Sequence, residues 1–214
     1  MGVAERRERE RAELRRQIID AARDLLVEQG LPGLSMRAIA ERVEYSPATI
    51  YLYFRDKHEL VDEVVHTGFG MLAETVEAEL VRTGETASAI DQYGAMGRAY
   101  ARFAVENPAY FRVMFELPGT AEHSCDPVVE SPADFEAAVA MVRRAVEAGE
   151  VDAVDPRRMA LMGWGLVHGL TTLFLSGHLS TEIRSTDDFM DLIEDAMKSI
   201  YTGWKPGAPG AEAT

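Results

Sequence analysis

The stretch from residue 35 to residue 58 constrains the fold most, because it predicts two short helices joined by a tight turn. Ser35 can cap the first helix, Ser46 can cap the second, and Asp56 can cap the long helix that follows. Pro47 suits the first position of the second helix, where no backbone N–H is needed. The turn falls at Glu44 and Tyr45. Apolar side chains in the first helix recur at the i, i+3, i+4, i+7 spacing of one helical face: Met36, Ile39, Ala40 and Val43.

The second of these helices has an unusual outer surface. Ala40 is small enough to let the two helices cross closely, and Ile50 supplies the buried contact. A solvent-exposed helix normally carries Glu and Lys on its outer side. A helix that enters the major groove of DNA instead needs an outer side without acidic side chains, because it meets base edges and phosphates. The outward side chains here are small, hydroxylated or aromatic: Ala48, Thr49, Tyr51, Leu52 and Tyr53.

This stretch resembles the DNA-binding domain of TetR-family transcriptional repressors. The motif runs from Tyr45 to Phe54 and continues at Asp56, Lys57 and Leu60, and the likeness covers roughly residues 15–65. It implies phosphate contacts by Tyr53 and Lys57, and it places four residues at the end of the helix that enters the groove: Ser46, Pro47, Ala48 and Thr49. Three further residues complete the predicted DNA-binding set: Ser35, Arg37 and Tyr51.

Glu44 departs from the family pattern, which often has Gly at this turn position. If this residue adopts a positive φ, Glu is strained where Gly is not. Its carboxylate would also lie near the phosphates, so we expect modest affinity for an operator.

The N-terminal residues allow two interpretations. Six arginines are interleaved with four glutamates before residue 17: Arg6, Arg7, Arg9, Arg11, Arg15 and Arg16. They can form a solvated helical extension with i,i+4 ion pairs, or a basic arm that reaches the minor groove.

The charge of the chain is unevenly distributed. The formal net charge is −14, yet residues 1–60 carry 11 basic and 11 acidic side chains, so the whole acidic excess follows residue 60. Repulsion from the acidic part would leave the N-terminal part to face DNA, although an acidic surface also favours solubility. The single cysteine, Cys125, cannot form an internal disulfide, and the N-terminus has no apolar signal region. We therefore expect a cytoplasmic protein.

Apolar periodicity predicts an all-α fold of about nine helices and no strand. Gly30, Gly149 and Gly177 are expected to end helices. We predict a helix-turn-helix DNA-binding domain at 1–56 and a helical domain for effector binding and dimerisation at 57–214, with a disordered tail at 205–214. The expected helices span residues 8–29, 35–43, 46–53, 57–83, 87–106, 108–115, 132–148, 156–176 and 187–202, with a loop at 116–131.

One stretch without charged residues, 159–181, is long enough to be considered as a membrane span. Its two histidines and four glycines favour a buried helix of a helical domain instead, so we expect no membrane segment.

The second part carries a weaker resemblance. Trp164, His168 and Gly169 follow an aromatic segment that contains Phe111 and Met114, which is similar to a TetR-like subgroup with a Trp-His-Gly motif. The resemblance implies a small-molecule site and dimerisation through the last two helices. The expected pocket walls are Tyr100, Phe103, Phe111, Met114, Trp164 and His168, although most of these side chains can equally be plain core, and His168 a core histidine satisfied by one hydrogen bond.

These observations lead to one functional hypothesis. The chain is expected to be a homodimeric repressor, paired through residues 156–176 and 187–202, that binds a palindromic double-stranded operator and is released by a small apolar or amphipathic ligand. The alternative is a helical ligand-binding or interaction protein that has lost operator binding. No catalytic arrangement is visible, so we expect neither an enzyme nor a cofactor. A metal site at His123, Cys125 and Asp126 would need a distant fourth ligand, and we predict none.

Overall fold

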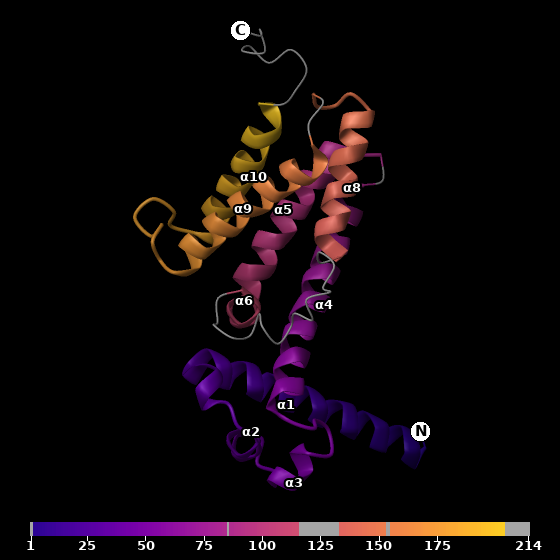
Figure 1. Ribbon diagram of the computed structural model, residues 1–214, viewed down its shortest axis with the longest axis vertical. Coiled ribbons are helices and arrows are strands. Elements are labelled where there is room, and N and C mark those ends of the chain that lie inside the picture. Colours follow the sequence, from indigo (N-terminus) through magenta and orange to yellow (C-terminus); the bar gives the residue numbers. More distant parts are fainter. Residues whose placement is uncertain (1, 85, 116–132, 153–154, 204–214) are drawn as a thin grey trace. The chain divides into compact units, whose positions relative to one another are not determined.

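The computed structural model describes residues 2–84, 86–115, 133–152 and 155–203, and the regular structure in these ranges is entirely helical (Figure 1). The nine helices of the described residues confirm the predicted all-α class. They are α1 (Val3–Gly33), α2 (Met36–Arg42), α3 (Pro47–Ile50), α4 (Lys57–Thr83), α5 (Ala89–Glu106), α6 (Pro108–Phe115), α8 (Ala133–Glu147), α9 (Pro156–Leu175) and α10 (Thr186–Thr202).

The chain groups into two compact units. The first unit contains α1, α2, α3, α6 and the beginning of α4, up to Gly70. The second unit contains the rest of α4, from Met71, together with α5, α8, α9 and α10. A single helix, α4, therefore contributes to both units. The division after residue 56 stays a prediction about where DNA binding ends.

Side chains cap the helix starts at the predicted positions. The Ser35 hydroxyl accepts a hydrogen bond from the N–H of Ala38 at 3.1 Å, and the Ser46 hydroxyl accepts one from Thr49 at 3.2 Å. The Asp56 carboxylate accepts two, from the N–H groups of His58 at 2.9 Å and Glu59 at 3.0 Å. Each cap satisfies N–H groups that have no partner inside the helix.

Glycines with a positive φ interrupt or end the helices. Gly149 (φ 71°) and Gly177 (φ 78°) follow α8 and α9 as predicted. Gly30 (φ 67°) does not end α1 but kinks it, and one further turn containing Pro32 follows. The start of α1 also differs from the prediction, because the helix begins at Val3 instead of residue 8.

In the first unit, α1 packs against α2 and α6, and α2 packs against α3. Ile18, Ile39, Ile50 and Leu60 are fully buried there. In the second unit, α5 is the central helix and contacts α8, α9 and α10 (Figure 1). Phe103 of α5 is fully buried.

The contact between α5 and α9 depends on a glycine. The Tyr93 hydroxyl donates to the carbonyl oxygen of Met159 at 3.2 Å. A Cβ atom on Gly163 would lie only 1.8 Å from that hydroxyl oxygen, so no larger residue fits without a shift. The second unit is further tied together by the buried Glu79 of α4, whose carboxylate lies 3.3 Å from the Arg98 guanidinium of α5.

The stretch at 159–181 forms most of α9 and the turns after it. Among the described helices, none has the length and apolar character needed to cross a membrane. The predicted loop at 116–131, the tail at 205–214 and the considered metal ligands His123, Cys125 and Asp126 lie outside the described residues. Within the described ranges, no group of three or more His, Cys, Asp or Glu residues could hold a metal ion.

Candidate nucleic-acid interface

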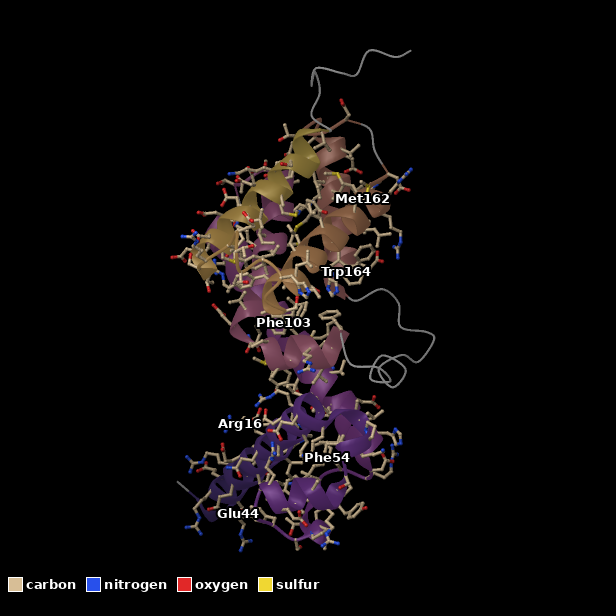
Figure 2. All side chains as sticks on the ribbon, turned by 90° about the vertical axis from the view of Figure 1, so that its left-hand side faces the viewer. Arg16, Glu44, Phe54, Phe103, Met162 and Trp164 are labelled. Carbon is tan, nitrogen blue, oxygen red and sulfur yellow. The ribbon has the colours of Figure 1, made fainter. Side chains whose placement is uncertain are left out.

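The turn between α2 and α3 is tight and left-handed. The N–H of Tyr45 donates to the carbonyl of Ala40 at 2.9 Å, and that of Glu44 to the carbonyl of Glu41 at 3.4 Å. This pair of bonds is the Schellman ending of a helix, whose left-handed position is usually glycine. Glu44, labelled in Figure 2, occupies that position. Its φ is 60°, and among the described residues it is the one non-glycine residue with a positive φ. The expected strain is therefore present.

Residues 46–54, called the recognition segment below, form the short helix α3 and the helical turns that continue it. Beyond Ile50, the N–H of Tyr51 donates to Pro47 at 3.2 Å, and that of Leu52 donates to Thr49 at 3.1 Å. Ile50 is fully buried, whereas Tyr51 is 56% exposed and Leu52 is 75% exposed. The outward position predicted for these side chains is thus what the structure has, with Ala48 also exposed.

The remaining predicted DNA-binding residues lie around this segment. The Ser46 and Thr49 hydroxyl oxygens are 3.0 Å apart, so the Thr49 side chain is held beside the cap. Arg37, in the first turn of α2, is highly exposed and forms an ion pair with Glu41 at 3.1 Å. Tyr53 and Lys57 are half-buried, and Lys57 is the first residue of α4.

Two arginines of α1 support the recognition segment, a role that the sequence analysis did not assign to them. The Arg11 guanidinium carbon lies 5.9 Å from the centre of the Tyr53 ring, and that of Arg15 lies 5.2 Å from the centre of the Phe54 ring. Arg15 also pairs with Glu63 of α4 at 2.9 Å. Cation–π contacts of this kind stabilise the ring positions and bring positive charge to the segment.

The arginine-rich N-terminus is helical in the structure. Arg6 pairs with Glu10 one turn later at 3.5 Å, and Arg16 pairs with Glu13. The N-terminus is therefore a helical extension with ion pairs along it, and whether its arginines reach the minor groove stays a prediction. Alternating Arg and Glu residues satisfy one another along a helix, which removes the charge repulsion that would keep such a segment extended.

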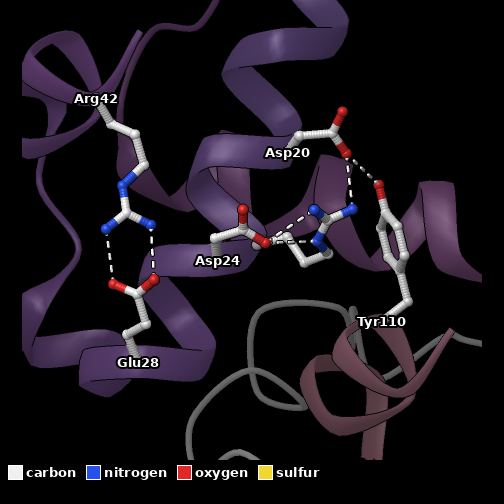
Figure 3. A network of polar contacts seen from close by, with 6 residues as sticks. Asp20, Asp24, Glu28, Arg42 and Tyr110 are labelled. Atoms are coloured by element: carbon white, nitrogen blue, oxygen red, sulfur yellow. Dashed lines mark hydrogen bonds and ion pairs between the residues drawn. The ribbon is translucent and has the colours of Figure 1, made fainter.

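Charged pairs fix α2 against α1 within the first unit (Figure 3). Both terminal nitrogens of Arg42 donate to the Glu28 carboxylate, at 2.9 and 2.6 Å. The guanidinium hydrogen bonds lower the pKa of Glu28 and raise that of Arg42. Two parallel bonds define an orientation as well as a distance, so this pair helps to set the direction of α2.

A second polar cluster joins α1 to α6 (Figure 3). Arg23 donates to Asp20 and to Asp24, both at 2.8 Å, and its guanidinium carbon lies 4.9 Å from the centre of the Tyr110 ring. The Tyr110 hydroxyl donates to Asp20 at 3.3 Å. Burial, reinforced by Asp20, raises the pKa of Tyr110. The helix α1, which contacts Tyr53 and Phe54 through Arg11 and Arg15, is therefore also tied to α6.

The predicted ligand-binding residues fall into two groups. Tyr100, Trp164 and His168 come together in the second unit: the Tyr100 hydroxyl lies 2.8 Å from Nδ1 of His168, and the Trp164 ring lies 6.3 Å from the His168 ring. Phe103 is part of the core of that unit. Phe111 and Met114 belong to α6 in the first unit, where both are buried.

Two sequence families match the chain. Residues 18–64, which include α2 and α3, match the bacterial regulatory proteins of the tetR family. Residues 94–197 match the tetracyclin repressor-like C-terminal domain. The chain belongs to the TetR family. Because this is a family of transcriptional regulators, the assignment agrees with the prediction that the chain is not an enzyme.

Curated relatives are similar over part of their length. An uncharacterised HTH-type transcriptional regulator of Haemophilus influenzae is 35% identical over 98 residues, which are 46% of this chain and 51% of that protein. The HTH-type transcriptional regulator Rv1816 of Mycobacterium tuberculosis is 30% identical over 115 residues, 53% of this chain and 48% of that protein. The chain thus spans about half the length of the curated relatives it matches.

Solved structures extend the likeness to most of the fold. A protein of unknown function from a Rhodococcus species superimposes with a TM-score of 0.70 at 26% identity, over 90% of this chain and 96% of that one. The TetR family transcriptional regulator PfmR of Thermus thermophilus gives a TM-score of 0.67 at 21% identity, over 86% of this chain and 96% of that one. At 21% identity, the likeness to PfmR concerns the fold alone.

Proposed function

We propose that this protein is a DNA-binding transcriptional regulator, most simply a repressor released by a small molecule. One observation carries the proposal: a short helix with an uncharged, exposed outer side lies directly after a capped turn, inside the segment that matches the TetR family. Globular proteins seldom leave such a helix without Glu or Lys on its outer side, and the major groove is the environment that suits it.

The proposed DNA contacts divide by role. Ser46, Pro47, Ala48 and Thr49 enter the groove, while Tyr53, Lys57 and Arg37 meet phosphates, which position the protein without specifying sequence. Ser35 and Tyr51 flank these contacts. Because Arg37 is paired with Glu41 on the surface, it can exchange that partner for a phosphate at little cost.

The decisive experiment is selection of bound duplexes from a random pool, followed by footprinting of the enriched sequence. Lys57→Ala should weaken binding to all duplexes and reduce the salt slope by about 0.9, the value for one lost phosphate contact. Arg144→Ala is the control, because Arg144 is an exposed cation of α8 in the second unit, outside the proposed DNA contacts, and donates a hydrogen bond to Gln92. No enrichment of any duplex at low salt would count against the regulator.

The proposed ligand site is centred on Tyr100, Trp164 and His168 in the second unit. Three observations support polar groups among aromatic walls there. The Tyr100 hydroxyl contacts His168, and the centres of the Trp164 and Phe135 rings are 5.9 Å apart. The buried Thr171 follows His168 by about one turn on α9. The Thr171 hydroxyl has no hydrogen-bond partner among the described residues. A buried hydroxyl without a partner is costly, so a ligand that bonds to it would be favoured. Phe103 adds an apolar contact in this unit, and the contacts of Phe111 and Met114 with a ligand stay predictions from the sequence.

We further propose a homodimer through α9 and α10, the helices predicted at 156–176 and 187–202. The sequence of α9 has no charged residue after Arg158. Gly165 and Gly169 have open space where a Cβ atom would point, unlike Gly163. The large apolar side chains exposed on α9 are Leu161, Met162, Trp164 and Leu173. Met162 and Trp164 are labelled in Figure 2.

A second copy of the chain would cover these groups by two-fold symmetry and would make the operator palindromic, with half-sites ~34–36 Å apart or a multiple of this. A ligand could then act by favouring a dimer in which the two recognition segments no longer match that spacing, limited by its differential affinity for the two states.

A helical ligand-binding protein that has lost operator binding is the second candidate, and Glu44 is the observation that favours it. Its carboxylate and its strained backbone lie directly before the recognition segment. A protein that dimerises and binds a ligand but enriches no duplex from the random pool would have this second function.

A further inference from the structure

Exposed apolar side chains in the first unit are concentrated at one place. Among the residues of this unit that the structure describes, the exposed large hydrophobic side chains are Tyr45, Tyr51 and Leu52, at 48%, 56% and 75%. All three lie in the turn before α3 or in the helical turns that continue it. Leu52 is the extreme case, because it is an aliphatic side chain with no polar group of its own to interact with water.

Leu52 belongs to a short apolar row on the recognition segment. It follows Ala48 by four residues and Thr49 by three, which places the three side chains on one side of a helical turn. The hydrogen bond from the N–H of Leu52 to Thr49 at 3.1 Å maintains that turn beyond the end of α3. Ile50, between them in sequence, is fully buried, so the row faces away from the core.

The charge around the row favours DNA over a protein partner. Residues 45–55 contain no Asp or Glu. Arg55, the last of them, and Arg37 of α2 are highly exposed, at 81% and 84% of the side chain. Their partners, Asp56 and Glu41, form surface ion pairs that a phosphate can replace at little cost. The major groove of DNA suits both the arginines and the apolar row. The phosphates along it attract cations, and the base edges in it carry one apolar group, the C5-methyl of thymine.

We propose that Leu52 determines sequence specificity by contacting a thymine C5-methyl group in each operator half-site, with Ala48 and the Thr49 methyl extending the apolar surface. This rests on the proposed function, and it assigns to Leu52 a base contact separate from the phosphate contacts of Lys57 and Arg37. Hydrogen-bonding residues are not required at this position, because the methyl group by itself distinguishes thymine from the other bases in the major groove.

The test replaces thymine by deoxyuridine, one position at a time, in the duplex selected by the wild-type protein. This change removes only the methyl group. We expect about fourfold weaker binding at one or two positions in each half-site, which corresponds to roughly 0.8 kcal/mol for one buried methyl-sized group. Leu52→Ala should weaken binding of the unmodified duplex by a similar factor and should abolish the effect of deoxyuridine at those positions, because both changes remove the same contact.

Two further variants sharpen the result. Val81→Ala removes a side chain that is equally exposed at 75% but lies in the second unit, and it should change neither affinity nor the deoxyuridine effect. Leu52→Gln should shift a renewed selection from thymine towards adenine at the same positions, since Gln bonds to the adenine edge. Both Leu52 variants should fold normally, as circular dichroism can verify, because the side chain is exposed.

The possible failures are distinguishable. Equal affinity for every deoxyuridine duplex would overturn the contact with thymine. A deoxyuridine effect that persists in Leu52→Ala, or one that disappears only in Tyr51→Ala, would assign the methyl contact to another residue. If no duplex is enriched at all, the proposed function fails, and the thymine contact fails with it. Binding of a protein partner to Leu52 in place of DNA would likewise contradict the thymine contact.

Discussion

At the scale of single residues, Glu44 combines strain and charge in one position. Its φ of 60° is costly for a residue with a side chain, so Glu44→Gly should raise the free energy of unfolding by about 0.5–1 kcal/mol, measured by urea denaturation. Glu44→Ala keeps the strain but removes the carboxylate, and it should leave stability nearly unchanged. Both variants should bind the operator more tightly. A stability gain of equal size for Ala would show that charge, and not backbone conformation, is the cause.

Gly163 is the residue that limits how closely α5 and α9 pack. Gly163→Ala places a methyl group against the buried Tyr93 hydroxyl and should lower the free energy of unfolding by about 1–3 kcal/mol. Gly70→Ala, in α4, meets open space and should instead stabilise the helix by up to about 1 kcal/mol. Thermal denaturation of the two variants checks the contrast, and a stable Gly163→Ala protein would mean that Tyr93 can move.

Sequence patterns predicted residues whose role is local. Ser35, Ser46 and Asp56 cap helices as expected, because a cap needs only neighbouring N–H groups. The contacts of Arg11 with Tyr53 and of Arg15 with Phe54 could not be predicted, because they join residues about 40 positions apart and depend on how α1 packs. The exposure of Leu52 was predictable from its place opposite Ile50, although the predicted DNA-binding set left it out.

At the scale of elements, the start of α4 responds to pH through Asp56. Hydrogen bonds from the N–H groups of Glu59 and His58 lower the pKa of this carboxyl from its ordinary value of 3.8. A group with a lowered folded-state pKa stabilises the fold above its unfolded value and loses this effect as the pH falls through the folded value. The cap should therefore be complete above about pH 4 and fail in more acidic solution.

Two variants test this cap. Asp56→Asn keeps a neutral acceptor and should reduce the pH dependence of the unfolding midpoint below about pH 4, with little loss at about pH 7. Asp56→Ala should lower the midpoint at neutral pH as well. An unchanged acid limb in Asp56→Asn would place the titrating group elsewhere.

Most element boundaries followed from the sequence, and the exceptions have physical reasons. The bounds of α4 and α6 agree with the predicted ranges, because apolar stripes and prolines mark them. The first residues of α1 have no such stripe, since nearly every described side chain before Leu14 is exposed and only Arg–Glu pairs favour the helix. Gly30 interrupts the helix as its glycine predicted, but one more helical turn follows before Leu34.

At the scale of the whole molecule, the proposed dimer predicts where charge should be disruptive. Leu161→Glu and Leu173→Glu introduce charge at exposed apolar positions of α9, and we expect monomers with much weaker operator binding. Val81→Glu is the control, because it adds the same charge at an exposed apolar position of α4. Phe174 is less suitable, since its ring stacks on the buried Phe189 ring at 4.1 Å, and charge there would unfold the chain. Sedimentation measures the outcome, and a monomeric wild-type protein at micromolar concentration would contradict the interface.

The grouping of the helices was the least predictable feature. The predicted effector part, residues 57–214, includes α6, and where DNA binding ends stays a prediction. By its contacts α6 groups with the first unit, where Tyr110 donates to Asp20. Periodicity reports which face of a helix is buried, not which partner buries it.

The return of α6 to the first unit has a consequence for biosynthesis. A ribosome releases the N-terminal residues first, yet the partner of Asp20 and Arg23 is residue 110, which emerges only after all of α5. Until then α1 lacks its contacts with Tyr110, so the nascent unit is less stable. It would unfold more often and be more accessible to proteases. We expect the maturation of this unit to wait for the translation of the chain beyond Phe115, so the capacity to bind DNA would be acquired only after α5 and α6 have been made, while α8, α9 and α10 still follow.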